Sequence, residues 1–349
     1  MGNIIKYRTE LMGISILWIM LFHAQVEIAS SLMPLKFIKS IGYTGVDIFF
    51  LLSGIGLMFS MSKNNSCKNF YIKRLIRIIP TFWLCIIIWG IKHYILGELS
   101  YNWFFLALTG TDFWVYGNLE MWFIPAILLC YLIFPAYFIS SHKFGAGKVF
   151  VAASAASFAA VFFAMEASLN YLLIFIIRMP VFFMGAYIGA LLIRDRNKNV
   201  FPEVLWNSKA VSVVFLILST ILMAVILLTT EDSYRWETGL WWYPSILMAY
   251  PLIMVISFLL SFVEILTDIL TNSMKWLGSI SLEIYLVHNI VFSLSDHMLF
   301  QGQSWNIARA PEYVIYFILS LIGAWLVNYA ISPINERLEN YGLGRERGN

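Results

Sequence analysis

Charged residues are scarce in this chain. They make up 12% of its 349 residues, roughly half the share of an ordinary soluble domain, whereas 60% of the residues are hydrophobic. Apolar runs of the roughly 20 residues that cross a bilayer recur along almost the whole length. The composition therefore excludes an ordinary soluble enzyme. It predicts an integral membrane protein with a single transmembrane domain over residues 1–349 and no separate soluble domain.

Cysteine is also rare. Cys67, Cys85 and Cys130 are the three cysteines, and no two of them have the spacing of metal ligands or of a redox pair. The sequence thus predicts neither a disulfide framework nor a metal site. The net charge of +3 comes without a face of basic and aromatic residues, so no nucleic-acid partner is expected. The first apolar run is too long for a removable signal peptide and lacks a cleavage site.

The apolar runs predict an all-α polytopic membrane protein with about ten transmembrane helices. Most Lys and Arg residues fall on one side if the N-terminus is cytoplasmic, so the positive-inside rule predicts cytoplasmic termini in the cell (inner) membrane. The expected spans are residues 10–30, 43–61, 78–96, 121–139, 149–166, 171–193, 209–229, 244–266, 277–297 and 313–333.

Polar residues inside these spans mark the candidate site, because a titratable side chain in a membrane is costly and is usually functional. His23 lies about two thirds of the way along the first span, and Glu27 follows four residues later on the same helical face. His23 is either a general base or a histidine that packs between helices with its nitrogens satisfied.

Three further polar residues are predicted at a similar depth in the outer half of the membrane. They are Asp47 in the second span, Glu120 at the start of the fourth and Arg178 in the sixth. A histidine, a carboxylate and a cation are the groups that acid–base catalysis needs. The alternative is that Glu27 and Asp47 form structural ion pairs with Arg178 or Lys39.

Two other polar segments carry separate predictions. FYIKRLIRIIP, residues 70–80, puts Lys73 and Arg77 on one helical face with Arg74 beside them. Such a cluster suits a phosphate-rich ligand or, equally, anionic lipid headgroups. Glu283 and His288 enter the ninth span, where His288 either lines a ligand channel or packs between helices.

Aromatic residues gather in the loops at residues 97–120 and 230–243, which the topology places outside. They form either the ordinary aromatic belt of a membrane protein or a platform on which sugar rings stack.

Six segments in register resemble the acyltransferase-3 family of bacterial membrane O-acyltransferases over nearly the whole chain. The family's basic residue eleven positions before its histidine corresponds to Met12, and Arg8 lies one turn earlier on the same face. The matching segments are His23, GVDIFFLLSG at residues 45–54, the R-x-x-R of Arg74 and Arg77 before Pro80, MWFIPAILLCYLIFP at 121–135, RMPVFFMG at 178–185, and the pattern Ser281, Tyr285, His288.

The resemblance implies transfer of an acyl group, usually acetyl, from cytoplasmic acyl-CoA to a hydroxyl of an envelope polysaccharide or lipid-linked glycan. It implies that His23 is the base or a transient acyl carrier, oriented by Glu27 or Asp47. The CoA phosphates would be held by Arg8, Lys73, Arg74 and Arg77, and the acceptor side would contain Glu120, Trp122, Arg178, Tyr285 and His288.

Two rival interpretations use the same polar residues. A glycan or lipid-linked sugar transporter would use them as a permeation path, and a catalytically silent assembly partner would keep only the fold. The acceptor, the acyl group and the oligomeric state stay open at this point.

Overall fold

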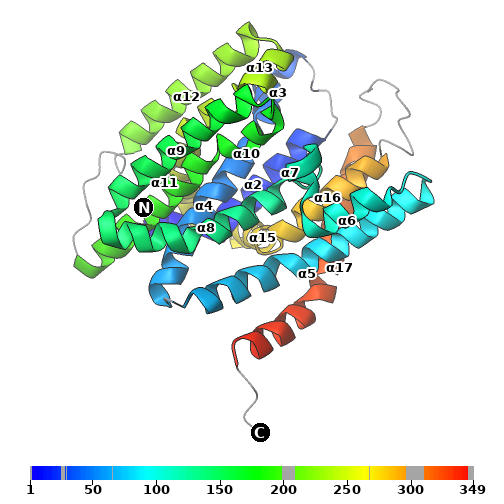
Figure 1. Ribbon diagram of the computed structural model, residues 1–349. Coiled ribbons are helices and arrows are strands. Elements are labelled where there is room, and N and C mark those ends of the chain that lie inside the picture. Colours follow the sequence, from blue (N-terminus) through cyan, green and yellow to red (C-terminus); the bar gives the residue numbers. More distant parts are fainter. Residues whose placement is uncertain are drawn as a thin grey trace. The chain divides into compact units, whose positions relative to one another are not determined.

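The computed structural model describes residues 2–24, 28, 30–64, 66–198, 209–266, 268–295 and 310–344. All regular elements within these ranges are helical (Figure 1). They are α1 (Gly2–Lys6), α2 (Arg8–His23), η1 (Ser30–Leu32), α3 (Met33–Ser40), α4 (Thr44–Lys63), α5 (Cys67–Ile95), α6 (Tyr101–Thr109), α7 (Asp112–Tyr116), α8 (Phe123–Phe144), α9 (Ala146–Glu166), η2 (Asn170–Leu172), α10 (Leu173–Ile176), α11 (Met179–Lys198), α12 (Lys209–Thr229), α13 (Asp232–Thr238), α14 (Tyr243–Leu266), α15 (Asp268–Ser279), α16 (Ser281–Ser295) and α17 (Ala310–Gly342).

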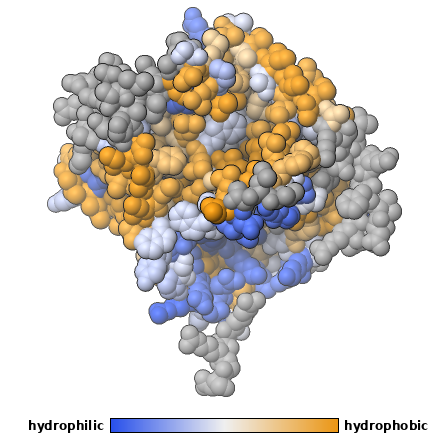
Figure 2. Space-filling model, turned by 180° about the vertical axis from the view of Figure 1, so that it is seen from behind, coloured by the Kyte–Doolittle hydropathy of each residue, from blue (hydrophilic) through white to orange (hydrophobic). Residues whose placement is uncertain are grey.

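Eight helices in the described ranges are long and apolar enough to cross a membrane, or nine if α15 and α16 together form one broken span. Hydrophobic residues cover much of the molecular face that Figure 2 shows, as expected of helices that face lipid. The predicted all-helical, multi-pass architecture is confirmed. The orientation of the termini stays a prediction.

Two of the differences between the predicted spans and the helices bear on the candidate site. The first expected span, residues 10–30, contains α2, whose 16 residues reach about 24 Å and so fall short of a bilayer core of about 30 Å. The ninth expected span, residues 277–297, contains a bend of 75° between α15 and α16. The length of an apolar run does not predict where a helix bends.

The helices divide into two compact units, each assembled from three stretches of chain. Unit 1 contains residues Met1–Ile19, Ile41–Lys63 and Ile133–Ser279, and unit 2 contains Met20–Ser40, Asn64–Leu132 and Ile280–Asn349. Each unit draws helices from distant parts of the sequence.

Helix α4 forms the centre of unit 1, and it packs most closely against α11. Their backbones approach each other at glycines: a Cβ atom at Gly54 would collide with the carbonyl of Phe182, and one at Gly185 with the carbonyl of Leu51. Gly189 lies one turn further along α11, where a Cβ atom would come within 2.8 Å of Cβ of Met58. Small residues at such a crossing let two membrane helices pack by backbone contact.

We therefore expect Gly185→Ala to destabilise the protein. The added methyl group meets a rigid backbone carbonyl, and overpacking of this kind costs about 1–3 kcal/mol or more. Thermal unfolding in detergent measures the effect. Gly147→Ala on α9 is the matched control, because its Cβ would lie 3.7 Å from the nearest heavy atom, on Tyr187. Equal melting temperatures for the two variants would contradict the packing described here.

Unit 2 contains α5, α16 and α17, which pack against one another. Helix α5 begins after Ser66, whose side chain accepts a hydrogen bond from the backbone N–H of Asn69 and so caps the helix. Two polar contacts fix the direction of α16: Arg77 of α5 binds Glu283, and Lys92 of α5 binds Ser293. Helices α5 and α16 therefore run parallel.

Candidate active site

His23 and His288 contact each other within unit 2. His23 is the last residue of α2, and its Nδ1 lies 2.9 Å from Nε2 of His288 on α16. The two rings are stacked, with centroids 5.2 Å apart. Nδ1 of His288 in turn lies 2.9 Å from the backbone carbonyl of Ile284. Two imidazoles and one carbonyl thus form a chain of hydrogen bonds.

The chain of hydrogen bonds determines which ring nitrogens carry protons when both rings are neutral. A carbonyl oxygen only accepts, so Nδ1 of His288 is the donor to Ile284 and Nε2 of His288 is left as an acceptor. Nδ1 of His23 must then donate to His288, which leaves Nε2 of His23 with a lone pair. That nitrogen is the atom that a general base needs.

The two histidines differ in accessibility. The His288 residue is completely buried, whereas His23, taken as a whole residue, is exposed. His23 is therefore the member of the pair that a substrate can reach more easily, and the contact with His288 can fix the tautomer and orientation of the His23 ring. The sequence left open whether His288 lines a ligand channel or packs between helices, and it did not pair His288 with His23, because the two residues are 265 positions apart.

Glu27 and Asp47 are the carboxylates predicted to orient His23. Glu27 lies outside the described residues. Asp47 is in unit 1, where its Oδ1 accepts a hydrogen bond from Nε of Arg178 at 3.2 Å. The ion pair between Asp47 and Arg178, which the sequence left open as an alternative, is therefore present in the structure.

Arg178 is enclosed by unit 1, and 1% of its side chain is exposed. Its guanidinium also donates to the carbonyls of Ile174 and Tyr43, and it lies 5.6 Å from the ring centre of Trp242. These contacts use the hydrogen-bonding groups that an oxyanion or an acceptor anion would need. Contact between Arg178 and a substrate stays a prediction, and it requires this packing to open.

Helix α16 carries a row of polar contacts along its length. The hydroxyl of Tyr285 accepts a hydrogen bond from the backbone N–H of Phe123 at 3.4 Å. Asn289 donates to the backbone carbonyl of Glu120 at 2.9 Å. Both partners lie at or just before the start of α8, so this segment is held beside His288.

Two residues predicted to contact the acceptor lie in this segment. Glu120 has an exposed side chain, and it lines a small crevice together with Asp112 and Trp103. Trp122 is 8% exposed and packs on Phe113, with 6.3 Å between ring centres. Glu120 can therefore reach a ligand in the present conformation, and Trp122 supports the local packing.

Glu283 of α16 is held by two other helices of unit 2. Its carboxylate accepts two hydrogen bonds from Arg77 of α5, at 2.5 and 3.1 Å, and one from Asn328 of α17 at 3.3 Å. The Glu283 side chain is fully buried, and that of Arg77 is 40% exposed. We call the two hydrogen bonds from Arg77 to Glu283 the Arg77–Glu283 fork. Because Glu283 lies five residues before His288, this fork sets the position of the helix that carries the buried histidine.

The basic residues predicted to bind CoA phosphates do not share one environment. Arg77 is bound to Glu283, Lys73 is exposed, and Arg74 lies between the rings of Phe70 and Tyr131. Arg8, in unit 1, donates from Nε to the carbonyl of Leu52 at 3.2 Å. The motif spacing showed that these residues are close in sequence, but it could not show that one of them has a buried carboxylate as its partner.

A comparison with known proteins identifies the family. Residues 11–329 match the acyltransferase domain that defines the acyltransferase-3 family. The chain belongs to that family. No curated protein and no solved structure gave a match. The acyltransferase-3 protein described here is accordingly a multi-pass membrane acyltransferase.

The two side chains of the Arg77–Glu283 pair differ in burial, and this difference gives a stability prediction. Arg77→Ala leaves Asn328 as the remaining partner of a fully buried carboxylate, so it should lower the free energy of unfolding by about 2–4 kcal/mol. This loss is smaller than for a pair of two buried charges, because Arg77 is 40% exposed. Glu283→Gln leaves a guanidinium that can reach water, so it should cost less. The double variant should be no less stable than Arg77→Ala. Thermal unfolding of the purified variants measures this order, and a less stable Glu283→Gln would refute the assignment.

Proposed function

We propose that the protein transfers an acyl group, with acetyl the expected one, from acyl-CoA to a hydroxyl of a cell-envelope polysaccharide or lipid-linked glycan. The observation that carries the proposal is the pairing of His23, an exposed residue, with the buried His288: the hydrogen bond from Nδ1 of His23 to His288 leaves Nε2 of His23 unprotonated. Membership of the acyltransferase-3 family supports the transfer of an acyl group.

The simplest mechanism uses His23 as general base. Its Nε2 accepts the proton of the acceptor hydroxyl while the hydroxyl oxygen attacks the thioester carbonyl carbon. The tetrahedral intermediate collapses, the carbon–sulfur bond breaks, and the imidazolium of His23 returns the proton to the CoA sulfur. General acid–base catalysis of this kind typically contributes a factor of about 10² to 10⁴.

The hydrogen-bond chain behind His23 supports this step. When His23 gains a proton, Nε2 of His288 accepts the hydrogen bond from the charged ring, and the carbonyl of Ile284 lies at the end of the chain. Charge-assisted hydrogen bonds are stronger than neutral ones, so both acceptors favour the imidazolium. A covalent acyl-histidine at Nε2 is the other route that this geometry allows.

The first test replaces His23. His23→Ala and His23→Gln should each lose acyl transfer by about 10² or more, because neither side chain supplies a base. The measurement is acyl transfer from radiolabelled acetyl-CoA in proteoliposomes, with thermal unfolding as the check that the variants fold. His142→Gln is the control, because His142 is an exposed histidine on the second half of α8. Activity of His23→Gln within a few-fold of wild type would remove His23 from the mechanism.

His288 should behave as a positioning residue. His288→Gln retains an amide oxygen that can accept from Nδ1 of His23, whereas His288→Ala leaves that N–H without its partner. We therefore expect higher kcat in His288→Gln than in His288→Ala, with little change in KM for the donor. Equal kcat in the two variants would show that the hydrogen bond does not orient His23.

The proposal also requires a defined orientation in the membrane. Because acyl-CoA is a cytoplasmic donor, we propose that residues 63–77 lie at the cytoplasmic side of the membrane and residues 230–243 at the outer side, as the distribution of basic residues predicts. Single cysteines at Asn64 and Ser233 in a cysteine-free background test this in intact cells. An impermeant thiol reagent should label position 233 alone, and labelling at position 64 would reverse the orientation.

A further inference from the structure

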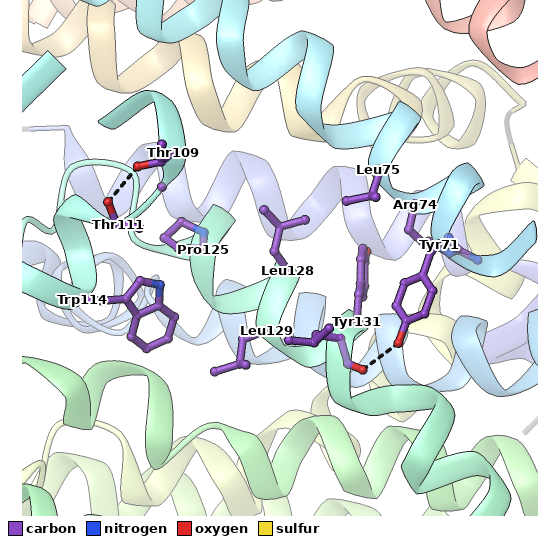
Figure 3. A pocket seen from close by; sticks show the side chains of 12 residues that line it. Tyr71, Arg74, Leu75, Thr109, Thr111, Trp114, Pro125, Leu128, Leu129 and Tyr131 are labelled. Carbon is purple, nitrogen blue, oxygen red and sulfur yellow. Dashed lines mark hydrogen bonds between the residues drawn. The ribbon is translucent and has the colours of Figure 1, made fainter. Parts of the chain in front are cut away.

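A groove of about 510 Å³ runs along one side of unit 2, between α5, the α6–α7 segment and α8. Figure 3 shows its two ends: Arg74 and Tyr71 at one, and Thr109, Thr111 and Trp114 at the other. The wall between the two ends is formed by α8 residues Pro125, Leu128, Leu129 and Leu132, and by Leu75 of α5.

The walls of the groove are apolar. Leu75 and Leu132 are 46% and 63% exposed, so the groove opens on a surface of two helices that are apolar enough to span a membrane. The hydroxyls of Thr109 and Thr111 hydrogen-bond to each other at 2.7 Å, and Tyr71 donates to the carbonyl of Leu132 at 2.9 Å. A hydrocarbon chain therefore suits the middle of the groove.

Arg74 supplies a positive charge at one end. Its guanidinium carbon lies 5.9 Å from the ring centres of both Phe70 and Tyr131. Among the described residues, Arg74 has no carboxylate within ion-pair distance, and its buried Nε has no hydrogen-bond acceptor. A buried donor without an acceptor is unfavourable, and an arginine fork fits the oxygens of a phosphate.

The groove lies on a different side of α8 from the histidine pair. Phe123 faces α16, since its backbone N–H binds the hydroxyl of Tyr285 and the two rings lie 5.4 Å apart. Pro125 is two residues later, about 200° around the helix, and Leu128, Leu129 and Leu132 continue its face. The groove therefore lies on a different side of α8 from the contact between Phe123 and α16.

The position of Arg74 along α5 is close to one edge of the hydrocarbon core, from where its long side chain can extend to the headgroup region. Helix α5 has 29 residues and is about 44 Å long, which exceeds a hydrocarbon core of about 30 Å. The ends of α5 therefore extend to the headgroup region. Arg74 lies seven residues after the first residue of the helix, and the apolar wall begins beside it and continues towards the membrane interior.

We propose that this groove binds one acyl chain of an anionic phospholipid whose phosphate is held by Arg74. The acyl chain lies against the leucines of α8, and the phosphate oxygens accept hydrogen bonds from the guanidinium. This inference is independent of the proposed catalytic function. It gives Arg74 a different ligand from the CoA phosphates that its motif predicts.

Native mass spectrometry of the detergent-purified protein tests the proposal, with palmitoyl-oleoyl-phosphatidylglycerol as the anionic probe and the corresponding phosphatidylcholine as its zwitterionic control. The wild type should retain one phosphatidylglycerol in preference to phosphatidylcholine. Arg74→Ala should weaken retention by about tenfold or more, because it removes a hydrogen bond to a charged group. Leu129→Trp should also reduce retention, because the larger side chain fills the groove while the charge stays in place.

Two matched variants control for charge and for surface size. Lys143→Ala removes a cation from the last turn of α8, and Ile91→Trp enlarges an exposed apolar residue of α5; neither residue lines the groove. Both variants should retain the lipid as the wild type does. Equal retention in all five proteins, or equal retention of the two lipids, would overturn the proposal. A raised KM for acyl-CoA in Arg74→Ala with unchanged lipid retention would also overturn it and assign Arg74 to the donor.

Discussion

Polar side chains inside a bilayer have to find their partners within the protein, because the hydrocarbon offers none. In unit 2 this constraint is met largely on one helix. Along α16, Glu283 binds Arg77 and Asn328, His288 binds His23, and Ser293 binds Lys92. The partners come from α2, α5 and α17, which are far apart in the sequence. The position of α16 is therefore fixed by hydrogen bonds as well as by apolar packing.

The proposed catalytic geometry depends on this arrangement. His288 can orient His23 only if α16 keeps its depth and its rotation, and a residue one position away would point about 100° around the helix. The fork from Arg77 to Glu283 holds the helix on one side of His288, and the contact between Lys92 and Ser293 holds it on the other. The buried ion pair thus supports the site without contacting a substrate.

Much of the fold could be predicted from the sequence because apolar length is a local property. The long helices occur where apolar runs of about 20 residues occur, and the family assignment followed from motifs in register. The break at Ile280 and the early end of α2 at His23 could not be predicted in this way. Polar residues flank both places, such as Glu27 after α2 and Ser279 and Ser281 around Ile280, but polar residues also occur inside unbroken helices and do not mark where a helix ends.

Most residues of the candidate site could be identified from the sequence, but the contacts between them could not. His23, His288 and Glu283 stand out as polar residues in predicted membrane spans, and Arg77 was identified as a member of the basic cluster at residues 70–80. The contacts between these residues depend on which helices pack against each other. A single sequence does not show which helices are neighbours when they are far apart along the chain. Asp47 and Arg178 illustrate this limit, because an ion pair and a place near His23 were both consistent with their depth.

The tautomer of His23 has a consequence for chemical labelling. Electrophiles such as diethyl pyrocarbonate attack an unprotonated imidazole nitrogen that solvent can reach. In the His23–His288 pair that description fits only Nε2 of His23, because Nδ1 of His23 carries a proton and the whole of His288 is buried. The same nitrogen is therefore where a covalent inhibitor with a small electrophile would form its bond.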